Sequence, residues 1–167
     1  MSVDRDPAQL HVPVLLNECL DMLAPAIEAP GAVLIDATLG MGGHTEAALT
    51  RFPQLTVFGI DRDPSAIALA SKRLEAFGTR FRAFHTTYDK MDEVAAHAPS
   101  GMVDGILMDL GVSSLQLDQE DRGFSYSHDA PLDMRMNPQT GISAAQLLAS
   151  ASKEEITRIL RVYGEEK

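Results

Sequence analysis

The sequence predicts an α/β fold with a mostly parallel, doubly wound sheet. As far as Asp109, short apolar runs alternate with stretches of helical periodicity, and the runs are apolar throughout instead of alternating with polar residues. Such runs are typical of strands covered on both faces, as the strands of parallel sheets are. Three of the runs lead into an aspartate, namely Asp36, Asp61 and Asp109. Ligands of such sheets bind beyond the carboxyl ends of the strands, so we expect these three carboxylates to line one crevice.

Each element has its own signal. Apolar residues at helical spacing after Pro13 predict an amphipathic helix with Cys19 on its buried face. Residues 32–35 form a strand that ends at Asp36, and a glycine-rich loop and a helix follow. Further strands, separated by helices, are predicted at residues 55–60, 80–85 and 103–108. Asp63 and Pro64 suit the N-cap and first position of the helix after the second strand, which we expect to reach Phe77.

Beyond Asp109 the pattern changes. Residues 110–140 have no sustained period, and loops of that length are uncommon unless they are functional. Ser143 to Gln146 and Ser152 to Glu155 are typical of capping boxes, so they predict two helices. We therefore expect a core domain over residues 1–140 and the start of a separate helical domain over residues 141–167.

The composition restricts the class of protein. The 167 residues include one cysteine and no basic segment followed by an apolar run at the N-terminus. This argues against a disulfide framework or secretory signal, and no apolar run is long enough for a membrane span. We expect a cytoplasmic protein. Its formal net charge of -10 argues mildly against nucleic acid binding.

The glycine-rich loop indicates a nucleotide-like cofactor. In Gly40-Met41-Gly42 the glycines allow a sharp turn, and the helix that follows offers unpaired N–H groups. The NAD fingerprint needs a third glycine after two further residues, but Gly43 and His44 are followed here by Thr45. A cofactor with an adenosine and a cationic amino acid end, but no pyrophosphate, would instead favour the acidic Asp36 beside the loop. A tight turn without a ligand remains the alternative.

Two further aspartates are candidates for chemistry. Asp61 follows the loop by about 20 residues, where a carboxylate accepts hydrogen bonds from ribose hydroxyls. A helix cap is its alternative role. Asp109 begins DLGVSSLQLD, and its carboxylate would orient an amine nucleophile for attack on a methyl group, unless it only caps a turn. Of the histidines, His44 alone falls in a candidate site, and with no second ligand at suitable spacing we expect no metal.

Five segments carry a family resemblance: HVPVLLNE, DATLGMGGHT, GIDRDPSAI, DGILMDLGVSSLQLD and RGFSYSHDAPLDMRMN. Together they resemble the ribosomal RNA small subunit methyltransferase H family, also called MraW. The resemblance implies a class I S-adenosylmethionine-dependent methyltransferase (Rossmann-like) fold with an inserted helical domain. It also implies methylation of N4 of a cytidine in the decoding region of small-subunit (16S) rRNA, with the small ribosomal subunit as partner.

The resemblance also implies the site residues. It places Asp109 as the catalytic residue and assigns cofactor contacts to Gly42, Gly43, His44, Asp61, Tyr88, Asp109 and Gln116. In the family a proline usually precedes this glutamine, whereas here Leu115 does. Asp133 and Arg135 are candidates on the substrate side without a fixed role.

Members of this family are about twice as long as this chain, so the resemblance implies that it is an N-terminal portion, inactive by itself, with an exposed sheet edge. A basic RNA-facing surface would then belong largely to the other portion. Three alternatives stay open: an NAD-dependent oxidoreductase, a module that binds the cofactor without turnover, and a methyltransferase acting on another amine.

Overall fold

The structure is a computed structural model that describes residues 13–127 and 129–166. It divides into two compact units, the first ending at Leu115 and the second beginning at Gln116. The domain boundary expected at residue 140 falls inside the second unit. Each unit is described by itself.

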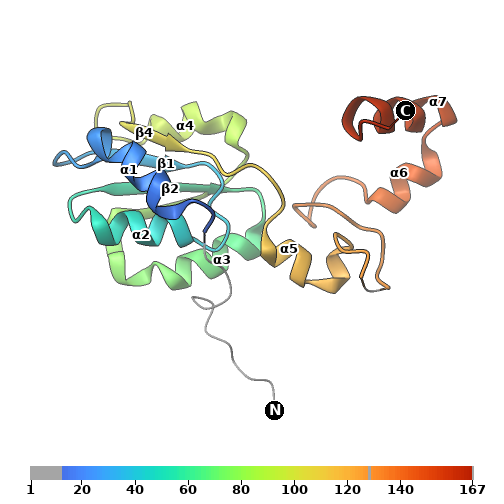
Figure 1. Ribbon diagram of the computed structural model, residues 1–167, viewed down its shortest axis with the longest axis horizontal. Coiled ribbons are helices and arrows are strands. Elements are labelled where there is room, and N and C mark those ends of the chain that lie inside the picture. Colours follow the sequence, from blue (N-terminus) through green and yellow to red (C-terminus); the bar gives the residue numbers. More distant parts are fainter. Residues whose placement is uncertain (1–12, 128, 167) are drawn as a thin grey trace, which may run out of the picture. The chain divides into compact units, whose positions relative to one another are not determined.

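The first unit is built on a parallel sheet in the order β3-β2-β1-β4. Its strands are β1 (Val33–Asp36), β2 (Thr56–Asp61), β3 (Phe81–His85) and β4 (Gly105–Leu107). The chain winds outward from β1 to β3 and then returns to place β4 on the other side of β1 (Figure 1). The predicted α/β fold with a parallel, doubly wound sheet is confirmed. The strand order reverses between β1 and β4, and ligands of such sheets bind at this reversal.

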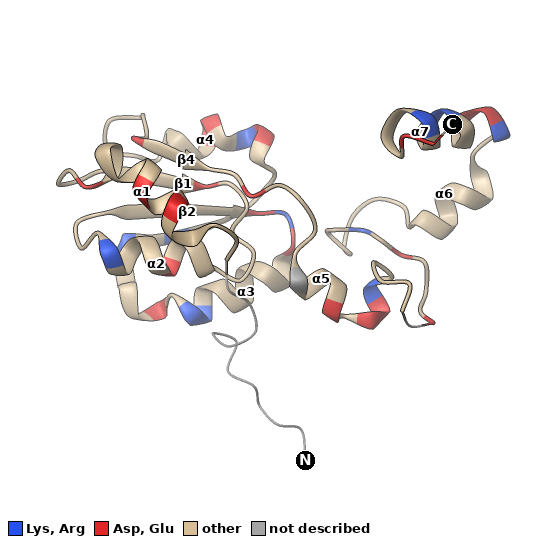
Figure 2. Cartoon of the chain, in the orientation of Figure 1, with Lys and Arg blue, Asp and Glu red and all other residues tan. Residues whose placement is uncertain are grey.

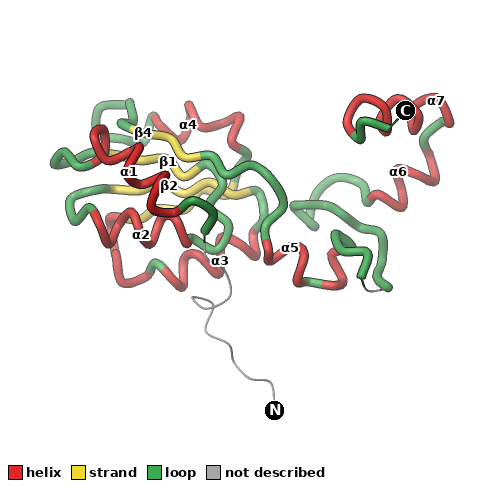
Figure 3. Tube along the Cα trace, in the orientation of Figure 1, coloured by secondary structure: helices red, strands yellow, loops and turns green. Residues whose placement is uncertain are grey.

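Helices cover both faces of this sheet. They are α1 (Leu16–Ile27), α2 (Gly43–Arg51), α3 (Pro64–Arg73) and α4 (Met91–Ala95), with 3-10 turns at Glu75–Arg80 and Tyr88–Lys90. Because successive strand residues point to opposite faces, Leu34 packs with α1, α2 and α3, whereas Ile35 packs with α4. Each face therefore has its own hydrophobic cluster, and helices pack on both faces (Figure 3).

Two elements are shorter than the sequence suggests. The helix expected to reach Phe77 ends at Arg73, and a 3-10 turn follows in which Gly78 has a φ of 57°. Strand β4 covers residues 105–107 instead of 103–108, and it ends at Leu107 because its partner β1 ends at Asp36, which pairs with Leu107. Asp109 therefore lies two residues beyond its strand, and the exposed residues Ile106 and Met108 show that β4 is not covered on both faces.

The described part of the second unit contains helices and loops and no strand (Figure 3). Helix α5 (Ser114–Asp118) crosses the boundary between the units, and a 3-10 turn (Glu120–Arg122), α6 (Ala144–Ser150) and α7 (Lys153–Tyr163) follow. The predicted capping box at Ser143 and Gln146 is confirmed, with both reciprocal hydrogen bonds present. Ser152 caps α7 by accepting a hydrogen bond from the Glu155 N–H.

Acidic side chains are distributed over several elements, among them α1, α4 and the strand ends (Figure 2). Within the described residues, no helix is long and apolar enough to cross a membrane.

Candidate functional site

The candidate site lies at the carboxyl end of the sheet, where β1 continues into the glycine-rich loop. Hydrogen bonds tie this loop to the strands on either side of β1. Towards β4, the Ala37 N–H donates to the Leu107 carbonyl over 2.9 Å; towards β2, the Leu39 N–H donates to the Ile60 carbonyl over 2.9 Å. The loop is thus fixed on both sides at the point where the strand order reverses.

Glycine is required in this loop for two physical reasons. Gly40 and Gly42 have φ angles of 51° and 79°, a region that other residues rarely adopt. A Cβ at Gly42 would also come within 3.0 Å of Leu74 Cδ1, and one at Gly43 within 2.6 Å of Pro13 Cγ. The loop therefore turns sharply and packs closely on its own protein surroundings.

Asp36 supports the loop from the protein interior. It is 1% exposed, and its carboxylate accepts hydrogen bonds from Thr45 Oγ1 over 2.7 Å and from the Thr38 N–H over 3.2 Å. Burial raises the pKa of Asp36, and the hydrogen bond from Thr45 opposes this change. We expected Asp36 to line an open crevice with Asp61 and Asp109. That expectation is wrong, because both of its oxygens are engaged inside the protein.

Asp61 is half-buried at the end of β2 and contacts the loop directly. Its Oδ2 accepts a hydrogen bond from the Gly40 N–H, and its Oδ1 accepts one from the Asp63 N–H, both over 2.8 Å. Burial raises the pKa of Asp61, and these backbone donors oppose the change. The helix cap that we considered for Asp61 belongs to Asp63, which accepts from the Ser65 N–H as N-cap of α3. Asp61 thus positions the loop and remains partly open to solvent.

Asp109 is exposed, and the first unit holds it through its backbone. Its N–H donates a hydrogen bond to Thr38 Oγ1 over 2.8 Å, although the two residues are 71 positions apart. The carboxylate of Asp109 therefore projects from a backbone that is fixed to the loop after β1. Asp61 and Asp109 thus follow β2 and β4, the two strands that flank β1, at the carboxyl end of the sheet.

The segment before α1 covers the start of α2. His44 Nε2 lies 3.1 Å from the Val14 carbonyl oxygen, and Pro13 packs against Gly43. Leu15, next in the chain, has a φ of 50°, which costs a non-glycine residue free energy. The sequence contained HVPV as part of a family motif, but no periodicity or charge pattern assigned it a place beside the loop.

The remaining candidates lie elsewhere. Tyr88 begins the 3-10 turn after β3 and is 46% exposed. Gln116 is buried and begins the second unit.

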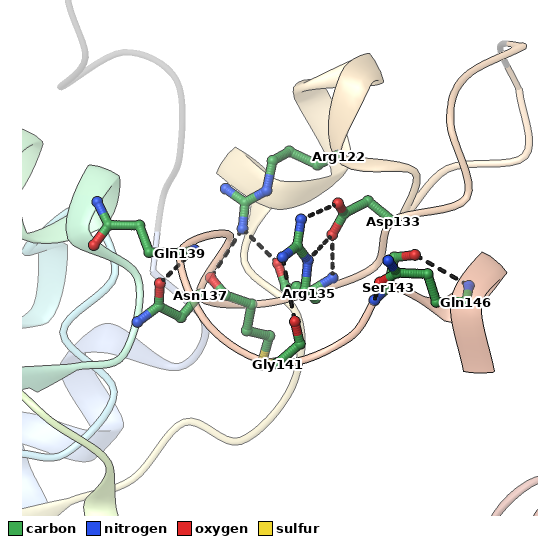
Figure 4. A network of polar contacts seen from close by, with 9 residues as sticks. Arg122, Asp133, Arg135, Asn137, Gln139, Gly141, Ser143 and Gln146 are labelled. Carbon is green, nitrogen blue, oxygen red and sulfur yellow. Dashed lines mark hydrogen bonds and ion pairs between the residues drawn. The ribbon is translucent and has the colours of Figure 1, made fainter.

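Asp133 and Arg135 also belong to the second unit and form an ion pair over 2.6 Å. Figure 4 shows this pair beside Arg122, whose guanidinium donates to two backbone carbonyls. In the described ranges, no group of three or more histidine, cysteine or acidic side chains is placed to hold a metal ion.

Comparison with known proteins identifies the family. A profile of the MraW methylase family matches residues 8–167. The chain belongs to the MraW methylase family. It is 59% identical over 164 residues to the ribosomal RNA small subunit methyltransferase H of Beutenbergia cavernae, covering 98% of this chain and 49% of that protein. The protein of the same name from Streptomyces avermitilis is 55% identical over 157 residues, covering 94% of this chain and 49% of that protein.

The chain thus spans about half the length of the curated relatives that it matches. Among solved structures, an rRNA methylase from Streptococcus thermophilus aligns with a TM-score of 0.41 and 22% identity, over 50% of this chain and 49% of that one. Membership of this methylase family and the sheet order confirm the predicted family and its Rossmann-like methyltransferase fold.

Proposed function

We propose that this chain provides the cofactor-binding portion of an S-adenosyl-L-methionine-dependent methyltransferase that acts on N4 of a cytidine in the decoding region of small-subunit rRNA. The observation that carries the proposal is the family match, because relatives that share more than half of these residues are named ribosomal RNA small subunit methyltransferase H. The partner is then the small ribosomal subunit, and the location is the bacterial cytoplasm.

The geometry of the loop supports this cofactor. The space that a Cβ at Gly40 would occupy is open, with the nearest described atom, the Thr38 carbonyl oxygen, 3.9 Å away. A ligand can therefore approach the backbone there. Asp61, beside Gly40, is partly exposed and retains lone pairs for two ribose hydroxyls. The cofactor contacts proposed are Gly42, Gly43, His44, Asp61, Tyr88, Asp109 and Gln116.

Asp109 is proposed as the catalytic residue. When bound, S-adenosylmethionine supplies an electrophilic methyl group. The exocyclic amine of cytosine is a poor nucleophile, because its lone pair is conjugated with the ring. A carboxylate that accepts a hydrogen bond from this amine fixes the orientation of the nitrogen and takes up the proton that it loses. Asp109 suits this role, since its side chain is exposed while its backbone is held by Thr38.

We also propose that α6 and α7 begin an inserted helical domain, with residues 1–140 belonging to the core. Several apolar side chains of α6 and α7 are at least half exposed, which fits helices that have further partners: Leu148, Leu160, Val162 and Tyr163. The basic surface that rRNA binding requires is proposed to lie outside this stretch.

The test measures methyl transfer from labelled S-adenosylmethionine to small ribosomal subunits that lack the modification. It uses the full-length protein, and nucleoside analysis locates the methyl group. Asp109→Asn is expected to lower kcat about 10²- to 10⁴-fold, because it removes the proton acceptor. The cofactor Kd is measured beside it, since Asp109 is also a proposed cofactor contact. Asp21→Asn, a change of the same size at an exposed carboxylate on α1, serves as the matched control.

Three outcomes contradict the proposal. Binding of NAD but not of S-adenosylmethionine would support an oxidoreductase. Cofactor binding without label transfer by the wild type would support a module without turnover. Methyl transfer to another amine, or to another rRNA position, would contradict the proposed substrate but would still support S-adenosylmethionine as the cofactor.

A further inference from the structure

Thr38 links the glycine-rich loop to Asp109. Its N–H donates to Asp36 Oδ1 over 3.2 Å, and its Oγ1 accepts from the Asp109 N–H over 2.8 Å. Asp36 in turn accepts from Thr45 Oγ1 on α2 over 2.7 Å. A continuous set of hydrogen bonds therefore runs from α2 through the buried carboxylate to the backbone of Asp109.

The contact between Thr38 and Asp109 is important because it lies just beyond the end of β4. The sheet ladder between β1 and β4 ends at Leu107, whose carbonyl accepts from the Ala37 N–H. The contact with Thr38 comes two residues later, where the chain leaves the sheet. Beyond it, Leu110 is 65% exposed, and a Cβ at Gly111 would meet no described atom within 4 Å. Thr38 thus holds the chain at the base of an otherwise open loop.

Thr38 is itself held firmly. Its neighbours Ala37 and Leu39 are buried, and their N–H groups form hydrogen bonds to β4 and β2 respectively. The Thr38 N–H is held by the carboxylate of Asp36, which is 1% exposed. The hydroxyl therefore has a defined position before any ligand arrives. An acceptor held in this way fixes the backbone at Asp109 relative to the glycine loop.

We propose that Thr38 is a positioning residue for methyl transfer: its hydroxyl sets the backbone of Asp109, and with it the place of the carboxylate relative to the cofactor loop. This inference rests on the proposed function. It makes Thr38 act through Asp109, with no contact of its own to cofactor or substrate.

The test compares Thr38→Val, which keeps the shape but removes the acceptor, with Thr38→Ser, which keeps the hydroxyl. Thr50→Val is the matched control, because the exposed Thr50 hydroxyl donates only to the Glu46 carbonyl within α2. Three quantities are measured in the full-length protein: kcat for methyl transfer, the Kd for S-adenosylmethionine, and amide hydrogen exchange at Asp109.

Thr38→Val is expected to lower kcat by about 10- to 100-fold, because displacing a reacting group by about 1 Å has effects of this size. The cofactor Kd should change much less than kcat, since Asp36 and Asp61 still hold the loop and Asp109 is only one of several proposed cofactor contacts. Exchange of the Asp109 amide should become faster. Thr38→Ser should recover most of the lost rate and of the amide protection.

The inference is overturned if Thr38→Val retains the wild-type kcat, if its effect is confined to the cofactor Kd, or if Thr38→Ser is as impaired as Thr38→Val. Should Thr38→Val fail to fold, Thr38→Ala removes the same hydroxyl with less bulk and is judged by the same criteria. If the wild type transfers no methyl group, the proposed function fails and this role for Thr38 fails with it. An active wild type with an unimpaired Thr38→Val variant overturns this inference alone.

Discussion

The two units of the chain are stabilised in different ways. The first has hydrophobic clusters on both faces of its sheet, with side chains such as Leu49 and Ile60 at most 1% exposed. Among the described residues of the second, the buried side chains are polar: Gln116 and Arg122. Since burial of apolar surface is the main favourable contribution to folding, the first unit has what an independent fold needs. The second depends more on polar contacts within its own loops and helix caps.

The largest expected difference between the units comes from removing a leucine side chain. Leu49→Ala in α2 should lower the free energy of unfolding by about 2–5 kcal/mol, because it leaves a cavity in a closed core. The matched change Leu148→Ala in α6, where the side chain is 51% exposed, should cost less than about 0.5 kcal/mol. Urea unfolding followed by circular dichroism measures both. Similar losses at the two sites would show that the second unit has a core of its own.

A smaller effect is expected when Arg122 is replaced in the second unit. Its Nη2 donates to the carbonyl oxygens of Arg135 and Met136, each over 2.9 Å, and the side chain packs on Phe124. Arg122→Met keeps most of the volume but removes these donors, so opening of this loop should become easier by about 1–3 kcal/mol. Hydrogen exchange should then accelerate in peptides from residues 119–146.

The same variant distinguishes the two units. Exchange in the peptides of β1 and β2 should not change, because a hydrophobic core holds them. Arg158→Ala is the control, since Arg158 forms an exposed ion pair with Glu155 in α7 and should have little effect. Loss of protection in both units after Arg122→Met would show that the two units do not open independently.

Much of the fold was predictable because its signals are local. The apolar runs located the strands, Asp63 and Pro64 marked the start of α3, and Ser143 with Gln146 marked that of α6. The strand-end pattern also placed Asp61 and Asp109 at one edge of the sheet. The extent of β4 was not predictable, because a ladder ends where the partner strand ends, and the apolar sequence of β4 continues beyond that point.

The supporting contacts of the site were not predictable for a related reason. Thr38 and Asp109 are 71 positions apart, and Val14 and His44 are 30 positions apart. Periodicity does not reveal which hydroxyl or carbonyl will meet across such a separation. Asp36 was expected to line a ligand crevice, because it stands at the carboxyl end of a strand of a parallel sheet. Its burial depends on Thr45, whose role as a donor one turn into α2 appears only once the helix is packed.

The smallest expected effect is a difference in pH dependence between two aspartates, one in each unit. Burial raises the pKa of Asp36, whereas the hydrogen bond from Arg135 lowers the pKa of Asp133 to about 2. A raised pKa means that folding favours the protonated form. The first unit should therefore lose stability as pH rises from about 4 through the raised pKa of Asp36. A lowered pKa has the opposite sign: the contribution of Asp133 is present above about pH 4 and is lost as pH falls towards 2.

The variant Asp36→Asn tests whether the first unit loses stability as pH rises. The amide can still accept from the Thr38 N–H and donate to Thr45 Oγ1, but it carries no charge that burial would penalise. Its urea midpoint relative to the wild type should therefore rise as pH increases from 4 to 8. Asp133→Asn should differ from the wild type by a small amount that stays constant over this range, because the ion pair is exposed, and this difference should vanish as pH falls towards 2. A midpoint difference for Asp36→Asn that stays constant with pH would mean that Asp36 keeps its ordinary pKa, and that Thr45 and the Thr38 N–H compensate fully for its burial.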